Sequence, residues 1–375
     1  MTDLRDPASL YDLGRELEAA GDLRGAAEAF DSAYGVAPDN PTLIGARARV
    51  LDRLEVREHG LVFRYIPRGT FLMGSQAGDP DEQPVHAVTV SDFWLTDVST
   101  SWEAYCRLLG WQAPPIGLPD GKSLQSGAEK ECVFMFWTHL LRQYCEDETL
   151  RAGDPSLHWP LDPARELPAE RAQRLRAGSV SRSDPSRPWG YGQKPLVGVD
   201  WSQANYLASR LTTPGVLYRL PSEAEWEHAA RGGLSGAPYP WGSDPPTAAN
   251  CDFNRFREFS LQKSRRFSPN GYGLYAMAGS VWEWTSDWYD AEYYRHSPRV
   301  NPSGPDTGKQ KVIRGGSWAD SADAVTVSFR MSRRVRAAPE GLFSCGDCPN
   351  IGFRLARVDR GVSKSSSDGF HAPGS

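Results

Sequence analysis

The amino-acid sequence predicts an α+β protein in which a small N-terminal all-α helical hairpin precedes a loop-rich domain. The chain of 375 residues contains 36 Gly and 29 Pro, residues that interrupt regular elements and favour turns. It also contains 13 Trp, whose large apolar rings can hold irregular segments together. Apolar residues recur at helical spacing near the N-terminus, whereas several later segments alternate as strands do.

Residues 1–55 are the predicted helical segment. Within it, eight positions have the spacing of one tetratricopeptide repeat, which the segment resembles: Leu10, Leu13, Gly14, Leu17, Ala26, Phe30, Ala33 and Pro38. The pattern predicts helices over 7–20 and 23–35, and a third helix over 41–54. One repeat buries too little apolar surface to be stable alone, so it must dock on the large domain or on another chain. A hairpin that extends the core and a module that binds a partner protein are both consistent with the sequence.

The regular elements of the large domain, residues 56–360, follow from periodicity. Strands are expected at Leu61–Ile66, 85–90 and 93–95, and helices at 101–109, 202–210 and 222–232. Ser222 and Glu225 have the spacing of a capping box, in which the hydroxyl and the carboxylate each satisfy an end N–H of the helix.

Two further segments have a different character. Residues 112–190 read as an insertion, with a helix over 129–150 that is apolar on every side near 133–137 and therefore buried or at an interface. Its later part is rich in Pro, Arg and Ser, which is typical of a surface loop. The tail, 361–375, is polar and Ser/Gly-rich, which predicts disorder.

Charge and hydropathy exclude some classes of function. The formal net charge of −5 argues against a nucleic-acid partner. No apolar run reaches 18 residues, so we expect no membrane association. The first residues lack the basic-then-apolar pattern of a signal peptide, and the six cysteines are scattered along a large chain. We therefore expect reduced thiols and a cytoplasmic protein.

The most informative stretch is 270–289, NGYGLYAMAGSVWEWTSDWY. It alternates glycines, which permit close backbone approach, with tryptophans that carry large apolar faces. In extended chain Glu283 points away from the face that Trp282 and Trp284 share. Its carboxylate must therefore be solvated, paired with a cationic side chain, or bound to a metal ion.

This stretch resembles the signature of the formylglycine-generating enzyme (FGE-sulfatase, sulfatase-modifying factor) family. Other blocks resemble the same family in the same order: GTFLMGS at 69–75, EQPVH at 82–86, KPLVGVDW at 194–201, YRLPSEAEWEHAARGG at 218–233, YPWG at 239–242, RGGSW at 314–318 and IGFR at 351–354. The resemblance implies a variant C-type-lectin fold, rich in loops and held by buried tryptophans. Members of the family differ in activity, so the fold alone does not decide the function.

The resemblance also implies that the family's oxidase chemistry is lost. Active members carry two cysteines five residues apart, which bind copper and activate oxygen. The matching positions here are Thr326 and Met331. A thioether forms no thiolate, and a hydroxyl is a poor ligand for a soft metal, so copper binding is not expected. Of the two interpretations, enzyme and non-enzyme, the sequence favours a protein without enzymatic activity.

An enzymatic alternative rests on Cys345 and Cys348, a single CxxC in the loop before the IGFR block. Zinc would need two further ligands, and the sequence has no second CxxC. A redox pair would need the helix N-terminus that lowers a thiol pKa. Under this alternative the chain is a family oxidoreductase, formylglycine-generating or using a non-haem metal, with an altered active site.

Calcium is the other cofactor that the resemblance implies. Family members hold one ion through groups that match Gly279, Val281 and Glu283, together with an asparagine whose position is Ala276 here. A second ion uses groups that match Asn250 and Cys251. Calcium needs six to eight oxygen ligands, and one side-chain ligand is missing. Calcium is therefore an open expectation.

The remaining hypothesis is a binding surface over about 318–350. The same fold serves the variable proteins of diversity-generating retroelements, which display diversified residues in this segment. The loop 342–349, LFSCGDCP, contains none of Glu, Gln, Lys, Met or Trp, which that diversification cannot produce at asparagine codons. An exposed Leu-Phe-Cys mixture is also typical of a binding patch.

The candidate ligand-binding residues are Trp318, Asp320, Ser321, Asp323, Thr326, Ser328, Arg330, Met331, Leu342, Phe343, Ser344, Cys345, Asp347 and Cys348. For Arg330, with Arg333 and Arg334, the favoured expectation is a pairing with carboxylates of the scaffold. The sequence thus predicts a non-catalytic protein that binds a protein or peptide ligand at a C-terminal groove, with a retroelement variable protein as its narrower form. A scaffold organised by the helical segment is a third hypothesis.

Overall fold

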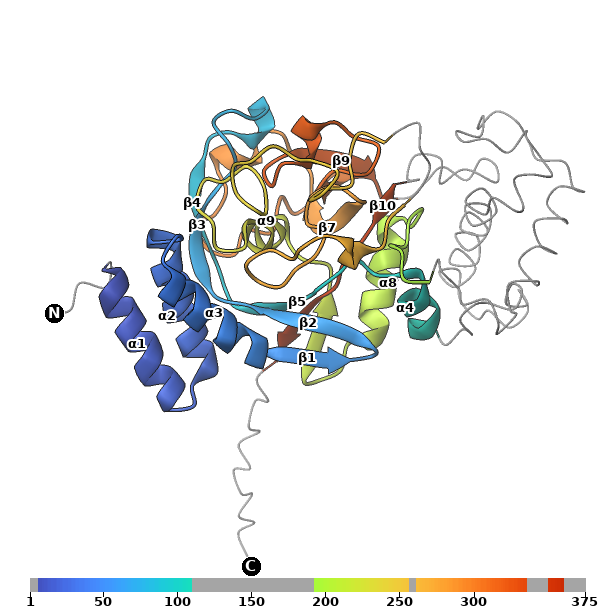
Figure 1. The fold of residues 1–375 in the computed structure, drawn as a ribbon. Coiled ribbons are helices and arrows are strands. Elements are labelled where there is room, and N and C mark those ends of the chain that lie inside the picture. Colours follow the sequence, from blue (N-terminus) through green and yellow to red (C-terminus); the bar gives the residue numbers. More distant parts are fainter. Residues whose placement is uncertain (1–5, 110–191, 256–260, 336–349, 361–375) are drawn as a thin grey trace, which may run out of the picture.

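The computed structural model describes residues 6–109, 192–255, 261–335 and 350–360. Three N-terminal helices lie side by side on one flank of a large domain built from three small sheets and long connecting loops (Figure 1). Helix α9 (Glu223–Arg231) lies at the centre of the large domain and contacts strands of two of the three sheets. The architecture is the mixed, loop-rich α+β fold that the sequence predicts.

The predicted N-terminal helices are confirmed as α1 (Pro7–Ala19), α2 (Leu23–Val36) and α3 (Pro41–Arg53). Each begins after a residue whose side chain accepts a hydrogen bond from an N–H of the first turn, namely Asp6, Asp22 and Asn40. Apolar faces of α2 and α3 belong to the same buried cluster as the core of the large domain. The helical segment therefore docks on the large domain, which supplies the apolar cover that one repeat lacks.

Arg47 of α3 joins the N-terminal helices to the large domain through hydrogen bonds and an ion pair. Its guanidinium donates to the carbonyl oxygens of Gly232 at 2.9 Å and Gly271 at 2.7 Å, both in loops of the large domain. It also pairs with Asp31 of α2 at 2.7 Å, and Asp31 in turn accepts a hydrogen bond from Tyr272 at 2.8 Å. Arg47 is only 4 % exposed, so its charge depends on these partners.

The largest sheet is antiparallel, with strand order β1-β2-β5-β11-β6. Its strands are β1 (Glu55–Glu58), β2 (Leu61–Ile66), β5 (Phe93–Thr96), β6 (Val216–Arg219) and β11 (Ala356–Asp359). The expected strands at Leu61–Ile66 and 93–95 are thereby confirmed. Helices α4 (Trp102–Leu108) and α8 (Trp201–Leu211) confirm two of the expected helices.

The second sheet has the order β10-β7-β8-β9 and contains parts of three family-like blocks, those at 270–289, 314–318 and 351–354. It consists of β7 (Trp282–Trp288), β8 (Gln310–Arg314), β9 (Arg330–Arg334) and the short β10 (Ile351–Gly352). Strands β3 (Gly69–Met73) and β4 (His86–Val90) form a separate pair, and β4 confirms the strand expected near 85–90. The capping box of Ser222 and Glu225 is also confirmed, because each side chain accepts a bond from the other residue's N–H.

Some predictions lie outside the described residues. These are the insertion 112–190 with its helix over 129–150, the loop 342–349 and the tail 361–375. Among the helices that the structure describes, none is long and apolar enough to cross a membrane.

The docking of the helical segment leads to a prediction about stability. Arg47→Ala should lower the free energy of unfolding by about 3–5 kcal/mol, because it leaves the buried Asp31 without its cationic partner. The measurement is chemical denaturation followed by tryptophan fluorescence. Arg49→Ala on the same helix is the control: its pair with Glu18 is solvent-exposed, so the change should stay within about 1 kcal/mol. Equal effects of both changes would contradict the role assigned to Arg47.

Candidate functional site

Glu283 on β7 is a buried carboxylate whose oxygens are fully used within the chain. Arg354 donates to both oxygens, at 2.6 and 2.8 Å. Trp226 of α9 donates its indole N–H at 2.8 Å, and Ser99 donates its hydroxyl. Glu283 is 1 % exposed and Arg354 is fully buried. The sequence left three alternatives for this carboxylate: solvation, a cationic side chain or a metal ion. The structure shows the cationic side chain, Arg354.

The calcium ligand set fits this arrangement poorly. A carboxylate offers about four lone-pair positions, and four hydrogen bonds to Glu283 occupy them. Gly279 has φ of +70°, and a Cβ there would meet the carbonyl oxygen of Asp252 at 2.3 Å, so close chain packing accounts for this glycine. Val281 is buried against Trp318. The oxygens of Glu283 are therefore occupied by donors of the chain itself, and they fit a calcium ligand poorly.

The second calcium position fits no better. The side-chain oxygen of Asn250 accepts bonds from the N–H and hydroxyl of Thr247, at 2.7 and 3.2 Å. The Cys251 thiol points to the carbonyl of Ala278 at 3.4 Å, and burial raises its pKa to about 12. Over the described part of the chain, no group of three or more His, Cys, Asp or Glu side chains is arranged to hold a metal ion.

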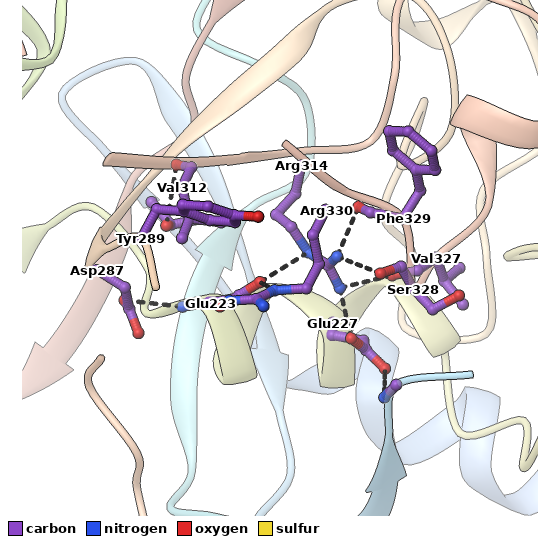
Figure 2. A network of polar contacts seen from close by, with 12 residues as sticks. Glu223, Glu227, Asp287, Tyr289, Val312, Arg314, Val327, Ser328, Phe329 and Arg330 are labelled. Atoms are coloured by element: carbon purple, nitrogen blue, oxygen red, sulfur yellow. Dashed lines mark hydrogen bonds and ion pairs between the residues drawn. The ribbon is translucent and has the colours of Figure 1, made fainter. Parts of the chain in front are cut away.

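A buried network joins two glutamates of α9 to two arginines of the second sheet (Figure 2). Arg330 donates to both oxygens of Glu223, at 2.7 and 3.0 Å. Arg314 pairs with Glu227, which also accepts from Arg231 and from the N–H of Gly74. Burial alone raises the pKa of Glu223, but the charges of Arg330 and Arg314 outweigh it and hold the pKa below its ordinary value. These four side chains are here called the arginine–glutamate network.

The arginine–glutamate network also fixes the backbone that leads into β9. Arg314 donates to the carbonyl oxygens of Val327 at 2.9 Å, Ser328 at 2.5 Å and Phe329 at 2.5 Å (Figure 2). Three consecutive carbonyls outside a regular element are thereby satisfied by one buried side chain. The network thus positions the segment between Thr326 and Met331.

Thr326 and Met331 flank that segment. Thr326 follows the 3-10 helix η6 (Ala322–Val325), is half-buried, and its hydroxyl lies 3.4 Å from the carbonyl of Asp323. Met331 lies on β9 opposite Ile313 and packs, half-buried, against the main core. Neither side chain carries a thiol, so these two residues offer no thiolate to a metal ion.

The other candidate ligand-binding residues divide by burial. Trp318 is buried with Val197 and Leu261, Ser328 is buried, and Arg330 pairs with Glu223. Trp318 and Ser328 therefore belong to the interior of the domain, and Arg330 has the scaffold role that the sequence favoured. Leu342, Phe343, Ser344, Cys345, Asp347 and Cys348 lie outside the described residues.

The part of this segment that reaches solvent is small. Ser321 and Asp323 are exposed on and beside η6. Asp320 is half-buried, and its carboxylate accepts from the N–H and hydroxyl of Ser317. Within the described residues, the available surface therefore centres on η6 and Thr326.

A cluster of half-buried aromatic rings beside η6 escaped the sequence-based prediction. Tyr239 and Trp241 stack with ring centroids 5.2 Å apart, and with Phe253 they pack against Val325. Tyr239 and Trp241 belong to the YPWG block, which was identified in the sequence only by its resemblance to the family. The motif did contain a signal for this stacked pair: two aromatic residues on either side of Pro240, followed by Gly242.

The fold and this site define a C-type-lectin-like domain of the formylglycine-generating enzyme type. A model of the sulfatase-modifying factor enzyme 1-like domain (FGE-sulfatase) matches residues 52–358. The chain belongs to this family.

Relatives with different names share the domain. A formylglycine-generating enzyme of Streptomyces coelicolor is 32 % identical over 78 % of this chain and 87 % of its own length. The inactive C-alpha-formylglycine-generating enzyme 2 of Mus musculus is 31 % identical over 78 % of this chain and 84 % of its length. A serine/threonine-protein kinase pkn1 of Chlamydia caviae is 31 % identical, but the match covers only 37 % of that protein.

A solved structure has the same fold. PvdO from Pseudomonas aeruginosa matches 81 % of this chain and 97 % of its own with a TM-score of 0.51 at 20 % sequence identity. At this identity the match establishes the fold alone.

Asp287 leads to a pH prediction for this site. Burial, and then the charge of Glu223, raise its pKa to about 7. The folded state therefore keeps a proton that the unfolded state releases near pH 4, so this group's contribution to stability is lost as pH rises towards 7. Compared with Asp287→Asn, the wild-type free energy of unfolding should fall from about pH 4 to pH 7.

Urea denaturation across that range measures this difference. Asp306→Asn, at an exposed carboxylate, is the control and should run parallel to the wild type. A constant difference between Asp287→Asn and the wild type across the range would refute the assignment.

Proposed function

We propose that this protein is a non-catalytic ligand-binding protein that displays a surface around η6 and the following segment on an FGE-type scaffold. The observation that carries the proposal is the pair Thr326 and Met331 at the positions of the copper cysteines. Threonine and methionine cannot supply the two thiolates that bind Cu(I) and activate oxygen. A chain of this family without the two thiolates, at Thr326 and Met331, is what we expect of a scaffold that binds a ligand without catalysis.

The physical organisation of the site supports this proposal. The arginine–glutamate network fixes the backbone beneath η6 and β9 without using any exposed side chain. Residues on the surface, such as Ser321 and Asp323, can therefore vary with little effect on folding. The half-buried rings of Tyr239, Trp241 and Phe253 offer the aromatic contact area that protein and peptide ligands use.

The relatives also bear on this proposal. One protein at 31 % identity carries the word inactive in its name, and another is a much longer kinase in which the matching domain is one part. The domain is therefore compatible with proteins that are not formylglycine-generating enzymes. We propose a protein or peptide ligand at the C-terminal groove and a cytoplasmic location.

Two finer proposals concern the ends of the chain. In the first, the segment 318–350 is the diversified region of a retroelement variable protein. A reverse-transcriptase gene beside a near-copy of the 319–350 coding segment would establish this, and a neighbourhood without either would refute it. In the second, the exposed face of the tetratricopeptide-like helices binds a further protein.

The enzymatic alternative is an FGE-family oxidoreductase with an altered active site. Identity of 32 % to a formylglycine-generating enzyme favours it, as does the thiol pair Cys345 and Cys348. It predicts a metal-dependent or redox activity that disappears when both cysteines become serine.

The first test is catalytic. Incubated with copper, oxygen and a Cys-x-Pro-x-Arg peptide, the wild type should form no formylglycine above a no-enzyme control and should retain no Cu(I). Thr326→Cys/Met331→Cys restores two thiolates on the fixed backbone and should bind about one Cu(I) per chain. Aldehyde formed by the wild type, and abolished in Cys345→Ser/Cys348→Ser, would establish the oxidoreductase instead.

The second test is of binding. Peptides selected from a displayed library on the wild type should bind Ser321→Arg/Asp323→Arg about tenfold more weakly or worse, because the two changes place bulk and charge on the proposed surface. Both residues are exposed, so the melting temperature should hardly move. Asp12→Arg on the outer side of α1 is the control and should bind as the wild type does. Peptides that bind all three proteins equally would place the binding surface elsewhere.

A further inference from the structure

A cavity of about 590 Å³ lies between segments of the large domain that are distant in sequence. Its walls come from the β1–β2 turn at Gly60, the chain after β5 at Asp97, helix α4 at Arg107 and the 3-10 helix η4 (Ser264–Arg266). This volume is typical of pockets that hold small molecules. The described residues that line it include none from 318–350, so the cavity is separate from the binding surface proposed above.

Positive charge gathers around this cavity. Among the described lining residues, five are basic and one is acidic: Arg107, Lys194, Lys263, Arg265, Arg266 and Asp97. The chain as a whole carries a formal net charge of −5, so this excess of positive charge runs against the average of the protein. Charges of one sign around a concave, low-dielectric wall focus the electrostatic potential and concentrate counter-ions. The cavity is therefore suited to an anion.

The single carboxylate does not neutralise the group, because it is committed to one arginine. Asp97 is 1 % exposed and forms an ion pair with Arg265. The guanidinium of Arg265 also lies 5.2 Å from the ring centroid of Tyr275. This pair holds η4 against the chain after β5, so Arg265 and Asp97 build the wall of the cavity.

Three other basic side chains form no ion pair with a carboxylate of the described residues, although the charge of Arg266 also reaches Asp252. Arg107 donates only to the carbonyl of Gly60, at 3.4 Å. Arg266 donates to the side-chain oxygen of Gln262 at 2.6 Å, and Lys263 is exposed beside it. These cations come from two different walls, α4 and η4, and their charge is available to a ligand.

The rest of the cavity wall is largely apolar. Leu61, Val62, Val98, Ala104 and Leu261 contribute to the lining. A ligand with an uncharged body and one or more anionic groups would find partners for both parts.

We propose that this cavity binds a phosphorylated small molecule. Guanidinium groups match the geometry of phosphate oxygens, can donate two parallel hydrogen bonds and keep their charge at all physiological pH values. The ammonium group of Lys263 adds a further point charge. The inference does not depend on the function proposed for the η6 surface.

The test measures binding of pyrophosphate and ATP to the purified full chain by isothermal titration calorimetry. Citrate, which carries carboxylates in place of phosphates, is the chemical control. The wild type should bind both phosphate compounds, and more weakly as NaCl rises from about 50 to about 200 mM, because salt screens exposed charges. Citrate should bind more weakly than pyrophosphate.

Two charge-matched variants distinguish a site from general attraction. Arg107→Gln/Lys263→Gln/Arg266→Gln should weaken pyrophosphate binding about tenfold or more, because each lost charge removes a charge-assisted contact. Arg15→Gln/Arg68→Gln/Arg295→Gln removes the same charge from exposed arginines elsewhere and should change the affinity less than about threefold. All six side chains are exposed, so melting temperatures should stay close to that of the wild type.

Three results would overturn the proposal. One is the absence of binding of either phosphate compound to the wild type at millimolar concentration. Both triple variants could lose affinity equally, which would mean long-range attraction without a site. Citrate could bind as tightly as pyrophosphate, which would refute the phosphate class of ligand.

Discussion

The pairing of buried arginines with buried glutamates is the interaction on which the large domain depends. Arg314, Arg330 and Arg354 are each 4 % exposed or less, and their partners are Glu227, Glu223 and Glu283. A charge removed from water costs several kcal/mol unless a partner and hydrogen bonds offset the loss. Each pair is therefore stable only in one geometry, and together they link α9 to strands and loops from across the chain.

These arginines also solve a problem that the loop-rich fold creates. Carbonyl groups in loops have no sheet or helix partner, yet many here are buried. Arg314 donates to three of them, Arg354 to that of Tyr275, and Arg47 to those of Gly232 and Gly271. A guanidinium has five N–H donors in a fixed plane, so it can serve a carboxylate and several carbonyls at once. Buried arginine side chains thus supply donors to carbonyl groups that, in a more regular domain, would be paired by neighbouring strands or helical turns.

This arrangement separates the scaffold from the chemistry on it. The groups that hold β9 are buried, whereas Thr326 and Met331 are half-buried at the edge of the segment they flank. A change of side chain at Thr326 or Met331 therefore leaves every member of the network in place. The same separation explains how one family can contain proteins named as enzymes and a protein named as inactive.

The sequence by itself determined the fold class, the three N-terminal helices and most strands of the first half. These depend on local periodicity, capping residues and the chemistry of single side chains, all of which can be read along the chain. Tertiary structure alone decided that Glu283 pairs with Arg354 and that Trp318 is buried. It also decided that Arg47 ties the helices to the loops at Gly232 and Gly271. The cluster of Arg107 with η4 around one cavity belongs here as well. Each of these depends on residues 37 to more than 200 positions apart, and no periodicity along the chain records which distant partner a charged or aromatic side chain meets.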